Sequence, residues 1–170
     1  MGIDVNEPAI DIARANGLDA HVKELKDVTE KFDLIVMNDF IEHTINPKEL
    51  IKKASELLNP KGYIYITTPK GDSFMAKVFK GSWLHRKPEQ HINIFNWATM
   101  FNLLDKNDLV IAEHGVVGRT RTLGVAFNKF KSYSDSLGRF FDFVIPNFIK
   151  NFPISINLRD EMFFLARGVD

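Results

Sequence analysis

The sequence predicts an α/β fold: a three-layer, doubly wound and mostly parallel sheet with helices on both faces. Short apolar segments that suit β-strands alternate with helical stretches of about ten residues, a succession typical of β-α-β units. One of these segments, residues 32–37, is apolar apart from a single charge, as expected of a strand that is covered on both faces. The length of 170 residues allows one such domain with a single core.

The amino-terminal part of the chain predicts a strand, a capped helix and a second strand. Residues 3–5 suit a short strand. Asn6 fits the N-cap of a helix, and Pro8 is tolerated in its first turn because the missing N–H has no helical partner there. Gly17 suits the end of this helix, and residues 19–25 follow as a short second strand.

The centre of the chain predicts a second capped helix and a further strand. Asn46 is the expected cap, Pro47 takes the first helical position, and Glu49 can fold back onto the cap as in a capping box. Residues 59–62 (Asn-Pro-Lys-Gly) predict a turn. Residues 63–68 then read as a strand.

The remaining predicted elements are a helix over 96–105 and strands over 109–113 and 161–166. The chain has no internal repeat and no linker. Residues 1–170 are therefore expected to form one domain.

Composition excludes several classes of protein. Apolar residues make up 45% of the chain and charged residues 26%, which is the composition of a folded soluble protein. The 22 basic and 22 acidic side chains leave no surplus positive charge for general nucleic-acid binding. Without cysteine there is no disulfide, thiolate metal site or cysteine nucleophile. No segment has the layout of a signal peptide or the ~20 apolar residues of a membrane span, so we expect a cytoplasmic protein.

Polar side chains follow the first three predicted strands, where open α/β sheets bind their ligands. Asp4 can accept hydrogen bonds from both hydroxyls of a nucleoside ribose, or it can cap the loop before the helix. Glu24 offers an acceptor for an exocyclic amine and Leu25 an apolar surface for a base, although a glutamate here is often only solvated. Asn38 and Asp39 follow the third strand.

Four stretches, taken in order and at this spacing, resemble the class I S-adenosylmethionine-dependent methyltransferases, in particular the group that includes the ubiquinone-biosynthesis O-methyltransferases. They are residues 2–7, 32–43, 57–69 and 88–95. The resemblance implies a Rossmann-like sheet whose last strand is antiparallel, S-adenosylmethionine as cofactor, and a small-molecule or lipid-like methyl acceptor.

The resemblance also implies roles for the residues at the strand ends. Asp4 would hold the ribose hydroxyls, and Glu24 and Leu25 would border the adenine. Asn38 and Asp39 would lie near the methionine end of the cofactor.

Two histidines are candidates for the acceptor side of the site. His43 has an unperturbed pKa that suits a general base, or it is a structural histidine bonded to a backbone carbonyl. His91 lies in a loop that also contains Trp83, His85 and Arg86, and such loops often carry function.

Asp39, Glu42 and His43 stand at positions i, i+3 and i+4, which on a helical turn places three potential ligands on one face. Some relatives in the ubiquinone group use similar residues for a divalent cation such as magnesium or manganese. The alternative is a polar helix start, in which Asp39 favours the positive end of the helix dipole. We favour this alternative and predict no metal.

The family's glycine-rich turn, which follows its first strand and approaches the methionine moiety, has no counterpart before Asp4. The resemblance implies that the missing strand is central in the sheet. Its removal would leave two strips of sheet with unpaired edges, and each unpaired buried backbone group costs about 1–3 kcal/mol. We therefore expect this sequence to be a truncated form of a longer methyltransferase, so that the DNA upstream of Met1 encodes a strand and a Gly-x-Gly turn.

Residues 119–153 form a Phe-rich insertion between the last two predicted strands. Its aromatic and aliphatic side chains recur every three or four positions, a pattern typical of amphipathic helices that pack on a core. The alternatives are a lid over an apolar acceptor and an interfacial segment that touches lipid.

The sequence therefore predicts methyl transfer from S-adenosylmethionine to a small-molecule or lipid-like acceptor, with no nucleic-acid partner. A non-catalytic remnant that serves as an interaction module is one alternative. A nicotinamide-dependent Rossmann enzyme is another, and it too needs a glycine turn before Asp4.

Overall fold

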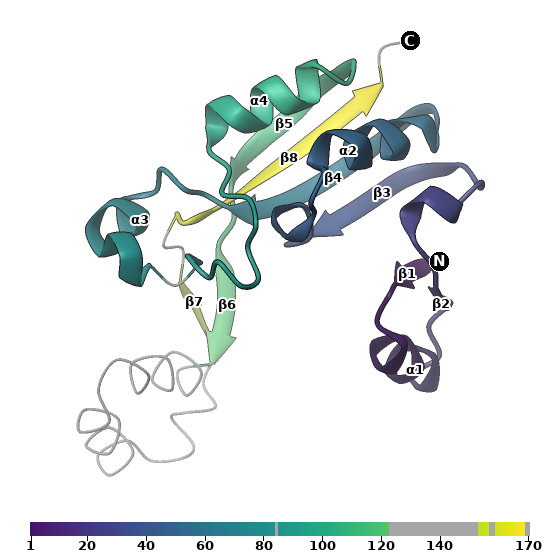
Figure 1. Cartoon of the computed structure of the whole chain (residues 1–170), viewed down its shortest axis with the longest axis horizontal. Coiled ribbons are helices and arrows are strands. Elements are labelled where there is room, and N and C mark those ends of the chain that lie inside the picture. The colour runs from purple at the N-terminus through teal and green to yellow at the C-terminus, as the bar shows by residue number, and fades with distance from the viewer. Residues whose placement is uncertain (84, 123–152, 157–158, 169–170) are drawn as a thin grey trace.

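The computed structural model describes residues 1–83, 85–122, 153–156 and 159–168 (Figure 1). Its elements in chain order are β1 (Gly2–Asp4), α1 (Glu7–Ala15), β2 (Ala20–Val22), η1 (Leu25–Asp27), β3 (Phe32–Asn38), η2 (Ile41–His43), α2 (Pro47–Glu56), β4 (Leu58–Pro69), α3 (Phe74–Phe79), η3 (Lys80–Ser82), α4 (Trp97–Asp105), β5 (Leu109–Val116), β6 (Arg119–Thr122), β7 (Pro153–Ile156) and β8 (Glu161–Gly168), where η marks a single 3₁₀ turn.

The strands form three separate sheets. The largest has the order β3-β4-β8-β5, and the others are the pairs β1-β2 and β6-β7. β3 runs parallel to β4, and β1 runs parallel to β2. β8 is antiparallel to both β4 and β5, which confirms the antiparallel last strand. The α/β architecture is thus the predicted one, and among the described residues β1-β2 and β3-β4-β8-β5 are separate sheets.

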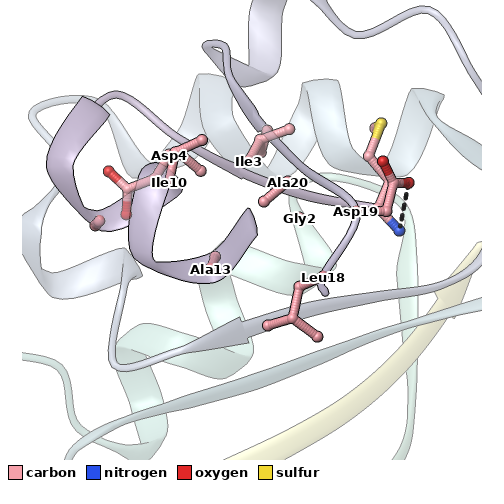
Figure 2. Close-up of a pocket in the computed structure, with 10 residues that line it drawn as sticks. Gly2, Ile3, Asp4, Ile10, Ala13, Leu18, Asp19 and Ala20 are labelled. Carbon is pink, nitrogen blue, oxygen red and sulfur yellow. Dashed lines mark ion pairs between the residues drawn. The ribbon is translucent and has the colours of Figure 1, made fainter. Parts of the chain in front are cut away.

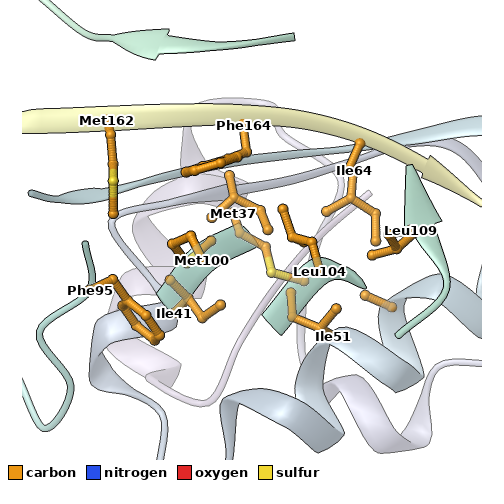
Figure 3. Close-up of a cluster of buried hydrophobic side chains, with 13 residues drawn as sticks. Met37, Ile41, Ile51, Ile64, Phe95, Met100, Leu104, Leu109, Met162 and Phe164 are labelled. Carbon is orange, nitrogen blue, oxygen red and sulfur yellow. The ribbon is translucent and has the colours of Figure 1, made fainter. Parts of the chain in front are cut away.

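The hydrophobic core lies between one face of the four-stranded sheet and two helices, α2 and α4 (Figure 3). Alternate residues of β4 and β8 point into it, among them Ile64, Ile66 and Phe164. Ile51 of α2 and Met100 of α4 meet them and are fully buried. One face of each helix carries these apolar residues, so both helices are held by apolar burial against the same side of the sheet.

The other face of the sheet is less covered. Leu34 and Val36 of β3 are 53% and 51% exposed. The expectation that β3 is covered on both faces is therefore wrong for the described residues. The reason is its position: β3 is the edge of the four-stranded sheet, and both helices of the core pack on the opposite face.

Local signals placed the starts of α1 and α2 correctly, although the capping box expected at Asn46 and Glu49 is only half formed. The Asn6 side chain accepts a hydrogen bond from the Ala9 N–H at the start of α1, and Asn46 accepts one from the Glu49 N–H at the start of α2. The reciprocal capping box forms at α4, where Asn96 and Thr99 bond each other.

Two predicted segments differ from the structure. The turn expected at 59–62 is a bulge inside β4, because the pairing with β3 shifts across it. Gly62 is needed there, since a Cβ at this position would lie 2.9 Å from the carbonyl oxygens of Asn59 and Phe32. The strand expected at 19–25 ends at Val22, and Leu25–Asp27 instead forms η1, where Leu25 packs against the core.

Two short strands at the ends of the insertion belong to the described residues. β6 and β7 pair antiparallel, and neither strand was predicted. The helices predicted from the phenylalanine pattern fall within 123–152, outside the described residues. None of the described helices is long and apolar enough to cross a membrane.

Because the two faces of the four-stranded sheet are covered unequally, substituting alanine on one face should change stability more than on the other. Ile66→Ala removes a fully buried side chain and should lower the free energy of unfolding by about 2–5 kcal/mol. Leu34→Ala, on the half-exposed face, should cost about 1 kcal/mol or less. Urea denaturation measures both, and equal losses would show that both faces are covered.

Candidate functional site

Asp4 ends β1 and contributes to an open hollow of about 470 Å³ (Figure 2). The hollow is lined by Met1, Gly2, Ile3, Asp4, Ala9, Ile10, Ala13, Leu18, Asp19 and Ala20. One oxygen of Asp4, Oδ1, accepts a hydrogen bond from the Asn6 N–H at 2.8 Å. The carboxylate therefore shapes the turn before α1, as the capping alternative supposed. Its second oxygen, Oδ2, has no hydrogen bond recorded within the part of the chain that the structure describes.

Glu24 and Leu25 differ in their surroundings. The Glu24 carboxylate is exposed and lies 2.8 Å from the Lys26 ammonium group. Leu25 begins η1 and is partly buried against the core. A base could therefore rest on Leu25, whereas Glu24 is engaged by a neighbouring cation.

Asn38 and Asp39 come at the carboxyl end of β3. Asp39 has a positive φ of 46°, an uncommon conformation for a residue other than glycine. Its N–H donates to the carbonyl and the hydroxyl of Thr67, and the Thr67 hydroxyl lies 3.4 Å from Asp39 Oδ1. β4 thus fixes the backbone turn that follows β3, next to the exposed side chain of Asn38.

His43 and His91, the two candidates for the acceptor side, lie together in the structure although 47 residues stand between them in sequence. Their ring centroids lie 4.8 Å apart in an edge-on arrangement. His43 Nδ1 lies 2.6 Å from the carbonyl oxygen of Gln90, next to His91. The structural alternative for His43, a bond to a backbone carbonyl, is therefore also realised.

Asn93 joins the turn at η2 to the loop that carries His91. Its backbone N–H donates to the carbonyl of Glu42, and its side-chain amide donates to the carbonyl of Thr44. Three hydrogen bonds, counted with the one between His43 and Gln90, therefore hold the two histidine-bearing segments together.

Glu42 is the buried member of this group. Its Oε2 accepts a hydrogen bond from the Thr68 hydroxyl at 3.0 Å, and both residues are fully buried. Burial raises the pKa of the Glu42 carboxyl, and nearby Asp39 adds to this; hydrogen bonds from the Glu42 backbone and Thr68, with the charge of His43, act in the opposite direction.

The same loop is fastened to the start of β8. His85 Nε2 lies 3.4 Å from Asp160 Oδ2 and 3.7 Å from Glu161 Oε1. The Trp83 ring is buried and lies against His85, at 5.2 Å between centroids. The His85 and His91 rings are stacked at 6.1 Å. Three imidazoles therefore gather at the ends of β3, β4 and β8.

Burial also changes the proton affinity of His91. It lowers the pKa of this imidazole, a hydrogen bond to the His85 backbone opposes the change, and the charges of His43, His85 and Lys87 lower the pKa further. His91 is therefore favoured in its neutral form, which can accept a proton.

The donor atoms of Glu42, His43 and His91 lie within 4.8 Å of one another, close enough to share one cation or one proton. The set that sequence spacing suggested, and that we set aside in favour of a polar helix start, was Asp39, Glu42 and His43. In the structure η2 is a 3₁₀ turn rather than an α-helix, and His91 takes the third place.

Sequence reasoning missed the residues that hold the site together. Thr67, Thr68, Gln90 and Asn93 each bond a candidate residue or its turn. The one available signal was the pair of threonines at the end of a predicted strand. The side-chain bonds that link these four residues to the site join positions 26 to 49 residues apart in sequence. Local sequence patterns do not extend that far.

Comparison with known proteins identifies the family and the fold. The family model described as a methyltransferase domain matches residues 1–114. The ubiquinone biosynthesis O-methyltransferase of Chelativorans sp. is 25% identical over 143 residues, which cover 75% of this chain and 53% of that protein. The chain spans about half the length of the curated relatives it matches.

Two solved structures show the same fold. Magnesium protoporphyrin IX methyltransferase from Synechocystis PCC 6803, with bound SAH, has a TM-score of 0.62 at 12% identity, and the match covers 99% of this chain and 63% of that chain. The [4+2]-cyclase SpnF has a TM-score of 0.58 at 13% identity and coverages of 98% and 65%.

The lowered pKa of His91 predicts a pH dependence of stability. The unfolded chain binds a proton at the ordinary value of 6.5, and the folded protein binds it only at lower pH. The free energy of unfolding should therefore fall as pH drops below about 6.5. His91→Gln should flatten this part of the curve in urea denaturation at several pH values, and an unchanged slope would contradict the assignment.

Proposed function

Since the chain belongs to the methyltransferase domain family, we propose that it takes part in methyl transfer from S-adenosylmethionine to a small-molecule or lipid-like acceptor, within a longer protein. The observation that carries the proposal is the family match over β1 to β5 together with the residues at the ends of those strands. The distant relative named as a ubiquinone biosynthesis O-methyltransferase supports an oxygen atom as one type of acceptor.

The residues at the strand ends fit part of the cofactor. Asp4 keeps one carboxylate oxygen for the ribose hydroxyls, because only Oδ1 is used by the Asn6 N–H. Leu25 offers a partly buried apolar surface for the adenine. Glu24 would have to leave Lys26 to bond the exocyclic amine. Asn38 and Asp39 lie at the end of β3, where the methionine moiety is expected.

The methionine side of the cofactor needs a further element. None of the 10 glycines stands two positions from another, so the chain contains no Gly-x-Gly turn. The described strands leave a place for one: β1-β2 and β3-β4-β8-β5 are separate sheets, and among these strands β3 pairs with β4 alone. We infer that an apolar strand ending in a glycine turn completes the sheet beside β3.

The histidines supply the acid–base chemistry on the acceptor side. Bound S-adenosylmethionine supplies a methyl group on a sulfonium. When the methyl carbon leaves sulfur and bonds to a hydroxyl oxygen, the hydroxyl proton must go to a base. His91 is suited to take it because burial favours its neutral form. His43, whose Nδ1 is bonded to Gln90, stands beside it. Alignment of donor and acceptor supplies much of the remaining rate.

The fold leaves a second function open. It is shared with the [4+2]-cyclase SpnF, so the architecture does not select methyl transfer by itself. The alternative considered from the sequence is a non-catalytic interaction module. A measurement of S-adenosylmethionine binding distinguishes the interaction module from the methyltransferase.

Titration calorimetry with S-adenosylmethionine tests the proposal on two proteins: the 170-residue chain and a chain extended by the codons upstream of Met1. Binding by the extended chain is expected. Binding by neither protein would favour the interaction module.

Asp4 can be tested in whichever of these proteins binds. Asp4→Ala should weaken affinity about tenfold or more, because a hydrogen-bonding charged group is lost. Asp11→Ala removes a carboxylate from the exposed side of α1 and should leave affinity unchanged. Unchanged affinity in Asp4→Ala would exclude Asp4 from the site.

A further inference from the structure

The short helix α3 exposes three large apolar side chains to solvent. Phe74, Val78 and Phe79 are 75%, 54% and 45% exposed. None of them belongs to the hydrophobic core, and α3 lies at one end of the molecule, away from α2 and α4 (Figure 1). Single exposed apolar residues are common on protein surfaces, but three within the six residues of α3 form an apolar patch.

Contacts at both ends of α3 fix its orientation. Before the helix, the Gly71 N–H donates to the Phe95 carbonyl. The buried Ser73 then caps the helix by accepting a hydrogen bond from the Ala76 N–H. After the helix, Trp83 is buried. Turning the apolar side chains inward would break these contacts, so their exposure is a property of the fold.

The segment that contains α3 is also basic. Residues 73–88 include no aspartate or glutamate and four basic side chains, those of Lys77, Lys80, Arg86 and Lys87. All four are exposed, and none of the ion pairs within the described part of the chain involves them. Because the whole chain has a net charge of zero, positive charge is concentrated in this segment.

Apolar and cationic groups alternate along α3 itself. Phe74 and Val78 stand four positions apart and therefore share one face of the helix. Lys77 lies between them in sequence, and Lys80 directly follows the helix. A surface of this composition needs a partner that offers an apolar phase and negative charge side by side.

The boundary of an anionic membrane offers both. Apolar side chains of an interfacial helix enter the region between headgroups and acyl chains, and lysine stems reach back so that their ammonium groups meet the lipid phosphates. We propose that α3 docks on an anionic lipid surface, with Phe74 and Val78 inserted and Lys77 and Lys80 at the headgroups. The docking does not rest on the proposed function, because it follows from exposure and charge.

The apolar surface continues toward the candidate histidines. A Cβ at Gly71 would collide with the Ile94 side chain, so the start of α3 lies against the segment that follows His91. Ile92 and Ile94 are 57% and 47% exposed. Under the proposed function, docking through α3 would therefore bring the loop of His91 close to a lipid-like acceptor.

Sedimentation of the 170-residue chain with lipid vesicles tests the docking without S-adenosylmethionine. Vesicles of equal parts phosphatidylcholine and phosphatidylglycerol should carry the chain down at low salt, whereas vesicles of phosphatidylcholine alone should carry down much less. Added salt should release the chain from the anionic vesicles, because it screens the attraction between the basic side chains and the headgroups.

Matched variants separate α3 from the other exposed surfaces. Lys77→Gln and Lys80→Gln should each lower the partition coefficient for anionic vesicles about fivefold, and Phe74→Ser should lower it about tenfold or more. Lys48→Gln on α2 and Ile12→Ser on α1 remove the same kinds of exposed group elsewhere and should leave it unchanged. Urea denaturation should give the same midpoint for all five, because each substitution lies on the surface.

A fluorescent label reports whether α3 itself enters the lipid. Since the chain contains no cysteine, one introduced cysteine gives one labelling site. A polarity-sensitive fluorophore on Val78→Cys should shift its emission to shorter wavelength on anionic vesicles, because the fluorophore leaves water. The same fluorophore on Ile12→Cys should keep its emission.

Three results would overturn the proposal. The chain could fail to sediment with anionic vesicles at low salt, or it could sediment equally well with the α3 variants, which would place the lipid contact elsewhere. The fluorophore at position 78 could also shift without vesicles as protein concentration rises, which would make a second copy of the chain the partner. Sedimentation that depends on α3 supports the docking whether or not the chain binds S-adenosylmethionine, so this proposal and the proposed function fail separately.

Discussion

The pairing of β4 on both of its sides is the interaction on which the rest of the structure depends. β4 bonds in parallel to β3 and antiparallel to β8, and it sends Ile64 and Ile66 into the core. Its end holds the site as well, because Thr67 bonds the turn at Asp39 and Thr68 bonds Glu42. The same strand therefore sets both the packing of α2 and α4 and the position of the candidate histidines.

The unpaired edge of β3 is the second feature that matters for the proposed site. An edge strand offers unpaired N–H and C=O groups to any strand that fits, and here the apolar side chains of Leu34 and Val36 lie half exposed beside that edge. Under the proposed function, a strand that ends in a glycine turn would pair with this edge. The candidate histidines, by contrast, are held by contacts within the chain.

The sequence predicted correctly those features that depend on residues close together in the chain. It did not predict the features that depend on contacts between distant segments. Asn6 and Asn46 cap helices through N–H groups three residues away, so their pattern was enough. The resemblance named His43 and His91 as candidates but not their contact, which depends on bonds between distant segments such as those from Asn93 to the turn at η2. The apolar sequence of β3 predicted that both faces of this strand would be covered. Whether a face is covered depends on which elements pack against it, and the spacing of apolar residues within β3 does not specify those elements.

Amide hydrogen exchange along β3 tests the open edge most directly. The Asp39 N–H donates to Thr67 of β4, and alternate residues of a strand direct their N–H groups to opposite sides. Ile35 and Met37 should therefore exchange slowly in the 170-residue chain, and Val36 and Asn38 rapidly. Extending the chain upstream should then slow exchange at Val36 and Asn38. Slow exchange at these two amides in the 170-residue chain alone would show that the edge is already covered and would contradict the account.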